Sequence, residues 1–297
     1  AYEIIEGDWS SDVCSSDLAE KEETMLNDQE LAELEDVARQ CRRDIVRMTH
    51  KAGSGHPGGS LSAIDALVVL YLRHMRVRPR EPLWHGRDMF FLSKGHCTPA
   101  YYAVLAARGY LPHEELLTFR AMGSRLQGHP SNTHLPGVDS SSGSLGQGLS
   151  IANGAALAAR YEGLDARYYV MIGDGESQEG QIWEAAMTAA ARGLDSVCAI
   201  IDVNGIQLDG TVESVKSLGD LPAKWRAFGW HVIDVDGHDL RAVDDALTEA
   251  ARTRGAPTTI ISRTVKGKGV SFMENTAKYH GLAPTDEELT TALEELR

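Results

Sequence analysis

The order of apolar and polar positions along the chain predicts a strand–helix–strand unit beyond its midpoint. An uninterrupted apolar run at 168–172, rich in β-branched and aromatic residues, has the length of a buried strand. Apolar residues then recur at helical spacing over about 179–192, and a second apolar run follows at 197–203. Two strands joined by a helix within one sheet are almost always parallel. Polar residues that follow these two strands are therefore expected at one edge of the sheet.

The same patterns divide the rest of the chain into alternating helices and strands. Helices are expected at about 28–51, 61–75, 101–108, 113–120, 147–160, 221–228, 240–253 and from about 285, and strands at 88–93, 230–235 and 258–264. Asn27 or Asp28 can cap the first helix, and Thr285 with Glu288 forms a capping box before the last. The alternation predicts one α/β domain over 25–297, with a doubly wound, mostly parallel sheet flanked by helices.

The polar residues at the predicted sheet edge could bind a divalent cation and a phosphate. Asp174 follows the first strand and Asn204 follows the second, and open α/β sheets bind ligands outside the carboxyl ends of their strands. Mg²⁺ prefers oxygen ligands, which a carboxylate, a side-chain amide and a backbone carbonyl just after Asn204 would provide. Gly173 and Gly175 allow a ligand to approach the backbone, and the start of the following helix adds positive potential.

The composition of the chain argues against some classes of protein function. The net charge of −14 argues against nonspecific nucleic-acid binding. No apolar run reaches the roughly eighteen residues of a membrane-spanning helix, so no membrane contact is expected. Four cysteines (Cys14, Cys41, Cys97 and Cys198) have no metal-ligand spacing and are typical of reduced thiols in a cytoplasmic protein.

The first 24 residues differ from the rest of the chain. They contain eight acidic residues and one lysine, a serine- and aspartate-rich stretch, and no clear helix or strand period. The absence of a basic leading region argues against a secretory signal. We expect a non-native leader, with Met25 as the natural start, or a disordered acidic tail.

Several motifs together resemble those of transketolases. GDG at 173–175, with an E-G pair at 179–180, W-E-A at 183–185 and Asn204, is similar to the family's motif for thiamine diphosphate and its metal ion. Further similar motifs are KAGSGHPGG at 51–59, S-K-G-H at 93–96, G-H-P at 128–130, S-G-S-L-G-Q-G at 142–148 and Y-H-G at 279–281. The chain departs from the family where a serine often follows the first G-H-P, so a hydroxyl contact to the diphosphate is either missing or shifted to Ser60.

The resemblance implies a role for each matching residue. His56 and His129 would contact the hydroxyls of the donor sugar and the developing oxyanion, while His96 and His280 would lie at the diphosphate and the donor. The remaining implied cofactor residues are Gly143, Leu145, Gly173, Asp174, Gly175, Glu179, Asn204 and Lys266, and the implied ligands of Mg²⁺ (or Ca²⁺) are Asp174, Asn204 and the carbonyl of Ile206.

Some of these residues have simpler interpretations. Lys266 could be a solvated loop lysine, and Glu179 could orient the cofactor's aminopyrimidine, hold a subunit contact or only favour a helix start. The other histidines are expected to be structural or on the surface. A G-x-G-x-x-G pattern at 53–58 follows a helix rather than a strand, and GDGESQ lacks the third glycine, so a dinucleotide-binding domain is disfavoured.

The resemblance also implies a partner, because it covers only the first third to half of a full transketolase. A second chain with the pyrimidine-binding domain would supply the glutamate that activates the cofactor and the arginines that bind sugar phosphates, giving an α₂β₂ assembly. The expected reaction transfers a two-carbon ketol unit from a ketose phosphate to an aldose phosphate. Alternatives are a deoxyxylulose-phosphate-synthase-like enzyme, a transketolase for an unusual sugar or sulfosugar, or a non-catalytic cofactor-binding subunit.

Overall fold

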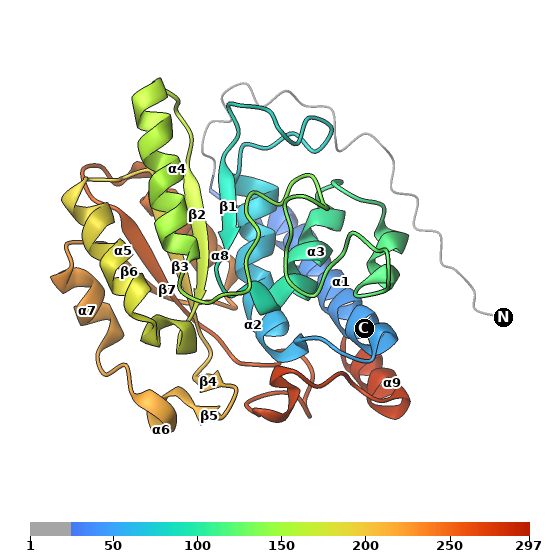
Figure 1. Cartoon of the computed structure of the whole chain (residues 1–297). Coiled ribbons are helices and arrows are strands. Elements are labelled where there is room, and N and C mark those ends of the chain that lie inside the picture. Colours follow the sequence, from blue (N-terminus) through green and yellow to red (C-terminus); the bar gives the residue numbers. More distant parts are fainter. Residues whose placement is uncertain (1–24) are drawn as a thin grey trace.

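A parallel five-stranded sheet forms the centre of the molecule in a computed structural model that describes residues 25–297 (Figure 1). The strand order is β1-β2-β3-β7-β6, and every neighbouring pair is parallel. The strands are β1 (Met89–Leu92), β2 (Tyr168–Gly173), β3 (Val197–Val203), β6 (His231–Asp236) and β7 (Thr258–Arg263). A small antiparallel pair, β4 (Ile206–Gln207) and β5 (Gly210–Thr211), follows β3. The predicted fold class and the parallel strand–helix–strand unit are confirmed.

Helices cover both faces of the sheet, as Figure 1 shows. One layer contains α4 (Gly148–Glu162), α5 (Gly180–Ala191) and α7 (Leu221–Ala227), and the other contains α1 (Asp28–Ala52), α2 (Pro57–Val69), α3 (Thr98–Ala107) and α8 (Leu240–Arg252). The remaining helices are α6 (Val212–Lys216) and α9 (Asp286–Glu295), with short 3₁₀ segments at Gly95–Cys97, His113–Thr118, Gly175–Gln178 and Lys278–His280. Within residues 25–297, no helix is long and apolar enough to cross a membrane.

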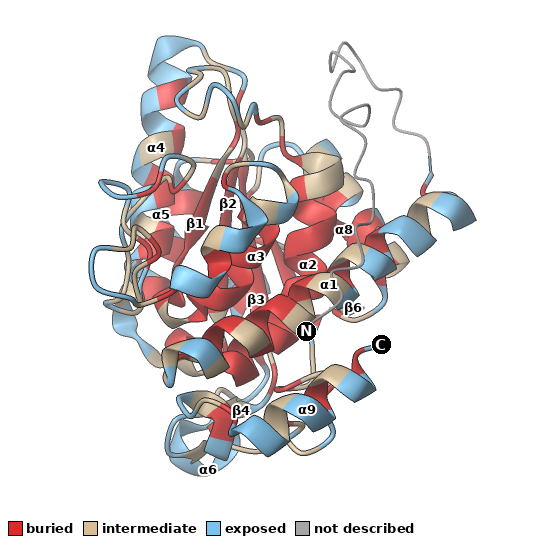
Figure 2. Ribbon diagram, turned by 90° about the vertical axis from the view of Figure 1, so that its right-hand side faces the viewer, coloured by how far each residue is buried: buried red, intermediate tan, exposed pale blue. Residues whose placement is uncertain are grey.

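Alternate residues of the central strands enter two separate cores. Tyr168, Val170 and Ile172 of β2 pack with α4 and α5, whereas Tyr169 and Met171 pack on the opposite side. Figure 2 shows buried residues along the strands and the inner helices, with exposed residues on the outer faces of α1 and α4. A strand buried on both faces reads as a continuous apolar run, which is why the sequence located β2 and β3 well.

All residues of α2 are buried, and this helix carries predicted site residues at its start. It begins at Pro57, earlier than the expected residue 61, because proline is well suited to the first helical position. It ends in a π-helical segment at Leu70–His74, so the expected single helix over 61–75 was wrong in its bounds. His56 is the N-cap residue of α2, which fixes its backbone beside the ends of the strands.

Helix caps and turns set the boundaries of the other predicted helices. Thr285 forms the predicted capping box, and Asn27, one of the two predicted caps of α1, caps it and forms a capping box with Glu30. The expected helix over 113–120 is a 3₁₀ segment, and the chain then turns sharply because Arg120 has a φ of 60°. The expectation for an acidic leader at 1–24 lies outside the described residues.

Candidate active site

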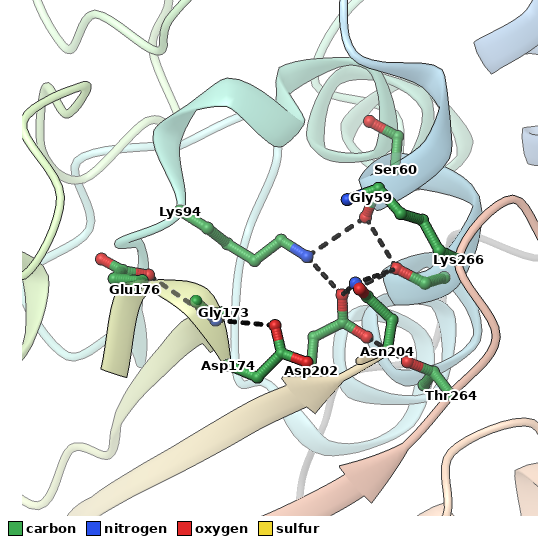
Figure 3. Close-up of polar contacts among 12 residues, drawn as sticks. Gly59, Ser60, Lys94, Gly173, Asp174, Glu176, Asp202, Asn204, Thr264 and Lys266 are labelled. Carbon is green, nitrogen blue, oxygen red and sulfur yellow. Dashed lines mark hydrogen bonds and ion pairs between the residues drawn. The ribbon is translucent and has the colours of Figure 1, made fainter. Parts of the chain in front are cut away.

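Polar side chains from four parallel strands meet at the carboxyl edge of the sheet. Lys94 follows β1, Asp174 follows β2, Asn204 follows β3 and Lys266 follows β7. Figure 3 shows Lys94 and Asn204 meeting around Asp202 at the end of β3, with Asp174 alongside. Because neighbouring strands are in parallel register, residues just past each strand end come to the same edge.

Asp174 is buried, with 3% of its surface exposed. One carboxylate oxygen accepts a hydrogen bond from the Gly175 N–H at 2.7 Å, and the other accepts from the Gly205 N–H at 2.6 Å. Burial and the neighbouring Asp202 raise the pKa of Asp174 to about 6, although these two hydrogen bonds act in the opposite direction. A cation next to this carboxylate would favour its charged form.

Asn204 and Ile206 provide the two other predicted metal ligands. The Asn204 Oδ1 accepts from the Ile206 N–H at 3.1 Å, and its Nδ2 donates to Asp202 at 2.9 Å. The carbonyl of Ile206 accepts a hydrogen bond from the Lys266 ammonium at 2.8 Å, so this oxygen already faces a cation. In residues 25–297, no three His, Cys, Asp or Glu side chains gather to hold a metal ion. A metal here would therefore depend on amide, carbonyl and ligand oxygens, as hard cations allow.

A buried ion pair that sequence reasoning missed lies beneath these ligands. Lys94 and Asp202 are 2% and 1% exposed and form a direct salt bridge, and Lys94 also donates to the Gly59 carbonyl at 3.2 Å. Asp202 accepts further hydrogen bonds from Ser62 at 2.7 Å and from Thr264. Burial would raise the pKa of Asp202, but Lys94 and these hydroxyls hold it below its usual value. A charged residue inside an apolar strand was the signal that could have located the pair.

Glu176 is a second residue that the sequence did not single out. One carboxylate oxygen accepts from Ser93 Oγ at 2.5 Å and from the Gly146 N–H at 2.8 Å, and the other accepts from the Gly173 N–H at 2.9 Å. Glu176 thus joins three loops of the site. Glu179, which was predicted instead, is exposed at the N-cap of α5 and makes no capping hydrogen bond with its side chain.

Lys266 is buried, so the alternative of a solvated loop lysine is wrong. Besides the Ile206 carbonyl, its ammonium contacts His280 Nδ1 at 2.9 Å. Burial and the charge of Lys94 lower the pKa of Lys266 to about 8. An anion brought to this position would reverse both effects and favour the charged ammonium.

Three of the predicted histidines form one cluster next to Lys266. The ring centroids of His56 and His96 are 5.1 Å apart, those of His56 and His280 are 5.5 Å apart, and those of His96 and His280 are 5.1 Å apart. Burial and the nearby charges of Arg120 and His129 lower the pKa of His56 to about 4. Burial, with Lys266 as the next cause, lowers the pKa of His280 to about 3.

The cluster is therefore neutral near pH 7. Burial and the adjacent Lys94 hold the pKa of His96 well below its usual value as well. Within the described chain, His56 Nδ1 is buried without a hydrogen-bond partner. A buried polar atom without a partner is costly unless a ligand or water satisfies it.

His129 and Gly143 lie together at the edge of this cluster. A Cβ built on Gly143 would come within 3.3 Å of the His129 ring, and Gly143 has a φ of 147° that favours glycine. His129 is exposed, and Leu145 is half-buried near the loop that Glu176 anchors. The structure thus brings His129 and Gly143 to the mouth of the cluster rather than to its buried part.

The backbone around the cluster leaves room for a close ligand. A Cβ on Gly59 would lie 3.0 Å from Cys97 Sγ and 3.8 Å from His96 Nε2, so glycine opens this approach. Ser60 donates to the His56 carbonyl at 2.7 Å, which occupies the hydroxyl that was considered for a diphosphate. Two buried ammonium groups, a buried carboxylate with a raised pKa and a histidine nitrogen without a partner suit a ligand that combines phosphates with a divalent cation.

Known proteins with similar sequences are transketolases. Residues 34–296 match the family model described as transketolase, thiamine diphosphate binding domain. The chain is 44% identical to the 6-deoxy-6-sulfo-D-fructose transketolase subunit SqwG of Clostridium sp., over 89% of this chain and 96% of that protein. It is 42% identical to a subunit of the apulose-4-phosphate transketolase of Phocaeicola vulgatus, over 86% of this chain and 90% of that protein.

Solved structures show the same fold over the same region. The transketolase from Leishmania mexicana superposes with a TM-score of 0.84 and 34% identity. That match covers 89% of this chain but 41% of the Leishmania chain, so this chain spans well under half the length of that relative.

Proposed function

This chain belongs to the transketolase family, in which it matches the thiamine-diphosphate-binding domain, and on that premise we propose that it is the N-terminal subunit of a two-subunit transketolase. Transketolases are transferases, and the proposed reaction moves a two-carbon ketol unit from a ketose phosphate to an aldose phosphate. The observation that carries the proposal is the convergence of Asp174, Asn204, Lys266 and the histidine cluster on one edge of a parallel sheet.

The cofactor diphosphate and a divalent cation would occupy this edge together. Asp174, Asn204 and the Ile206 carbonyl would hold Mg²⁺ or Ca²⁺, and the phosphate oxygens would complete its shell. The Lys266 ammonium, which now donates to the Ile206 carbonyl, would donate to a phosphate oxygen instead. That hydrogen bond is charge-assisted on both sides and therefore stronger. Glycines and apolar residues would line the remainder of the cofactor site; they are Gly143, Leu145, Gly173 and Gly175.

The histidines would position the sugar and stabilise charge. When bound, thiamine diphosphate supplies the carbanion chemistry of ketol transfer, and the protein supplies orientation, charge and exclusion of water. The neutral imidazoles of His56 and His129 would contact the donor hydroxyls and the developing oxyanion. His96 and His280 would lie between the diphosphate and the donor.

A second polypeptide would complete the site. The relatives named as transketolase subunits are similar to this chain over nearly their whole length, which supports an enzyme built from two different chains here. We expect the partner to carry the pyrimidine-binding domain and the assembly to be α₂β₂. Exposed apolar side chains on α4 and α5 would be covered in such an assembly; they are Ile151, Leu157, Tyr161 and Met187.

An unusual sugar is a specific alternative for the substrate. The two relatives described above are named for a sulfosugar and for apulose 4-phosphate, so a substrate of that kind is a second candidate. A deoxyxylulose-phosphate-synthase-like reaction stays an alternative, because it would use the same cofactor site. A purely cofactor-binding, non-catalytic role is less favoured, because the candidate metal ligands and all four histidines are in place.

A ketol-transfer assay with two proteins tests the proposal. The mixture contains this chain from Met25, a candidate partner with a pyrimidine-binding domain, thiamine diphosphate, Mg²⁺, xylulose 5-phosphate and ribose 5-phosphate. Parallel mixtures replace the donor with 6-deoxy-6-sulfo-D-fructose or apulose 4-phosphate. We expect turnover with one of the donors only when both proteins are present.

The controls separate the parts of this proposal. Asp209→Ala, on the exposed turn between β4 and β5, should retain turnover, whereas Asp174→Ala should abolish it. Full activity of this chain alone as a stable monomer would refute the requirement for a second protein. Absence of turnover with every donor, despite binding of the cofactor, would refute ketol transfer.

A further inference from the structure

His238 links a buried carboxylate to the backbone that leads into Lys266. It lies in the loop after β6, and its side chain is 12% exposed. The Val265 N–H donates to His238 Nε2 at 2.8 Å, and His238 Nδ1 contacts Asp65 Oδ2 at 2.7 Å. The sequence predicts only a structural role for this histidine, yet both of its ring nitrogens are engaged, one of them by the residue that precedes Lys266.

These two contacts define which ring nitrogen carries the proton. A backbone N–H can only donate, so Nε2 of His238 must be the unprotonated acceptor. Nδ1 then carries the proton and donates to Asp65. This order, from carboxylate to imidazole to backbone amide, holds the ring in one tautomer and one orientation.

The carboxylate end of this link is firmly held. Asp65 is 2% exposed on α2 and also forms a salt bridge with Arg42 at 2.5 Å. Burial would raise the pKa of Asp65, but the hydrogen bonds from His238 and Arg42 bring it below its usual value. Asp65 is therefore a fixed anion on the same helix that begins beside His56.

The loop that carries His238 is anchored to the end of β7. The Gly237 N–H donates to the Arg263 carbonyl at 2.8 Å, and a Cβ on Gly237 would lie 2.1 Å from Ser262 Oγ. The backbone of Lys266 is also tied to α2, because the Gly267 N–H donates to the Gly58 carbonyl at 3.0 Å. Val265 is thus held by a side chain on one side of Lys266, and Gly267 by backbone on the other.

We propose that His238 is a positioning residue that holds Lys266 in register with the diphosphate site. This role rests on the proposed function, in which Lys266 binds the cofactor diphosphate. The Lys266 ammonium reaches Ile206 and His280 only if its backbone stays at the end of β7, and the His238–Val265 hydrogen bond fixes that backbone. Loss of this bond removes the restraint on the N-terminal side of Lys266 without removing any group that touches the cofactor.

Two variants of similar size separate positioning from a general structural role. A glutamine side chain places its amide oxygen near the position of Nε2, so His238→Gln retains an acceptor for Val265 and loses the contact with Asp65. An asparagine amide lies near the position of Nδ1, so His238→Asn retains a donor for Asp65 and leaves Val265 without its acceptor. Each variant loses one hydrogen bond, but only His238→Asn releases the backbone before Lys266.

The experiment measures two properties of each variant. The first is hydrogen exchange of the Val265 amide by NMR in the protein without ligands. The second is the affinity for thiamine diphosphate with Mg²⁺ by calorimetry, with the partner subunit present. We expect His238→Gln to resemble the wild type in both. His238→Asn should lose protection at Val265 and bind the cofactor about tenfold more weakly, as is typical when a residue that orients a ligand-binding group is lost.

Matched controls make the result decisive. His231→Asn changes a half-buried histidine of β6 that pairs with Glu249 and should alter neither property. Asp65→Asn weakens the same link from its other end and should shift both properties in the same direction, so the proposal stays testable if His238→Asn does not fold. Equal cofactor affinity in the Gln and Asn variants would overturn the proposal. A wild-type chain that binds no cofactor would overturn the proposed function instead, while exchange at Val265 would still decide whether His238 holds this backbone.

Discussion

The clustered histidines at the carboxyl edge of the sheet and six histidines outside the cluster have opposite surroundings. Six histidines away from the cluster each contact a carboxylate, at distances of 2.7–3.1 Å; they are His50, His74, His85, His113, His231 and His238. Within residues 25–297, the cluster of His56, His96 and His280 contacts no carboxylate and lies among cations instead.

This difference determines which histidines can serve a ligand. A carboxylate either favours the imidazolium form, as the raised pKa of His113 beside Asp44 illustrates, or accepts the proton of a neutral ring, as Asp65 does from His238. Burial among lysines favours the neutral form, and its ring nitrogens can then donate to or accept from a bound sugar. The same cations that keep the cluster neutral would attract a diphosphate. The neutral state of the clustered histidines and the attraction for a diphosphate therefore have the same cause, which is the buried cations.

Removing the buried cation should have the largest effect on this contrast. Lys94→Met leaves Asp202 buried without its ionic partner, so the free energy of unfolding should fall by about 3–5 kcal/mol. Urea unfolding measures this loss. Lys278→Met, which breaks an exposed ion pair with Glu288, should cost far less, because solvent screens an exposed pair. Similar losses in the two variants would contradict the view that the edge depends on its buried cations.

Replacing one histidine in each region should affect activity more than stability. His56→Gln should lower kcat by about 10²–10³-fold if His56 acts as an oxyanion donor, since it removes an imidazole that faces the site. His231→Gln, which changes a half-buried histidine of β6 that pairs with Glu249, should leave kcat unchanged. Steady-state kinetics with the assembled enzyme makes the comparison, and circular dichroism checks that both variants are folded. An equal loss of kcat in both would remove the distinction between the two groups.

The pH dependence of unfolding should have opposite signs for a histidine in the cluster and a histidine outside it. We expect this effect to be the smallest of the three predicted here. The pKa of His56 is lowered to about 4 from 6.5, so the unfolded chain binds a proton that the folded chain rejects. Stability from neutral His56 is present above about pH 6.5 and is lost as pH falls toward 4. The pKa of His113 is raised from 6.5, so its stabilisation is present below pH 6.5 and is lost as pH rises through the folded pKa.

Thermal unfolding of the ligand-free chain across pH 4–8 tests these signs. His56→Gln should flatten the loss of stability on the acid side, whereas His113→Gln should remove only the weaker stabilisation below pH 6.5. Curves that change in the same direction for both variants would show that the surroundings of the two histidines do not differ as described.

The sequence predicted the parts of the fold that depend on local pattern. The apolar runs of β2 and β3 and the helix between them were correct to within about one residue, because strands buried on both faces carry a strong signal. The capping box at Thr285 was visible as a residue pair three apart, and Asn27 was visible as a candidate cap. The place of β7 between β3 and β6 was not predictable, since it depends on which distant strands pair.

Dependence on distant contacts also separates the site residues that the sequence identified from those that it missed. Asp174, Asn204 and the histidines stand in loops with glycine or proline neighbours, so motif spacing could single them out. Lys94 and Asp202 are 108 positions apart in the sequence, and the role of each becomes visible only when the fold pairs them. His238 was set aside for the same reason, because its partners Asp65 and Val265 come from other elements.

Cofactor binding by the edge of the sheet is the central claim, and a calorimetric titration tests it most directly. Thiamine diphosphate is titrated into this chain, with its partner present, in the presence and absence of Mg²⁺. Asp174→Ala is titrated beside Asp209→Ala, which changes an exposed aspartate of a neighbouring turn. We predict Mg²⁺-dependent binding that is lost in Asp174→Ala and retained in Asp209→Ala. Unchanged, Mg²⁺-dependent binding by Asp174→Ala would contradict the assignment of the site.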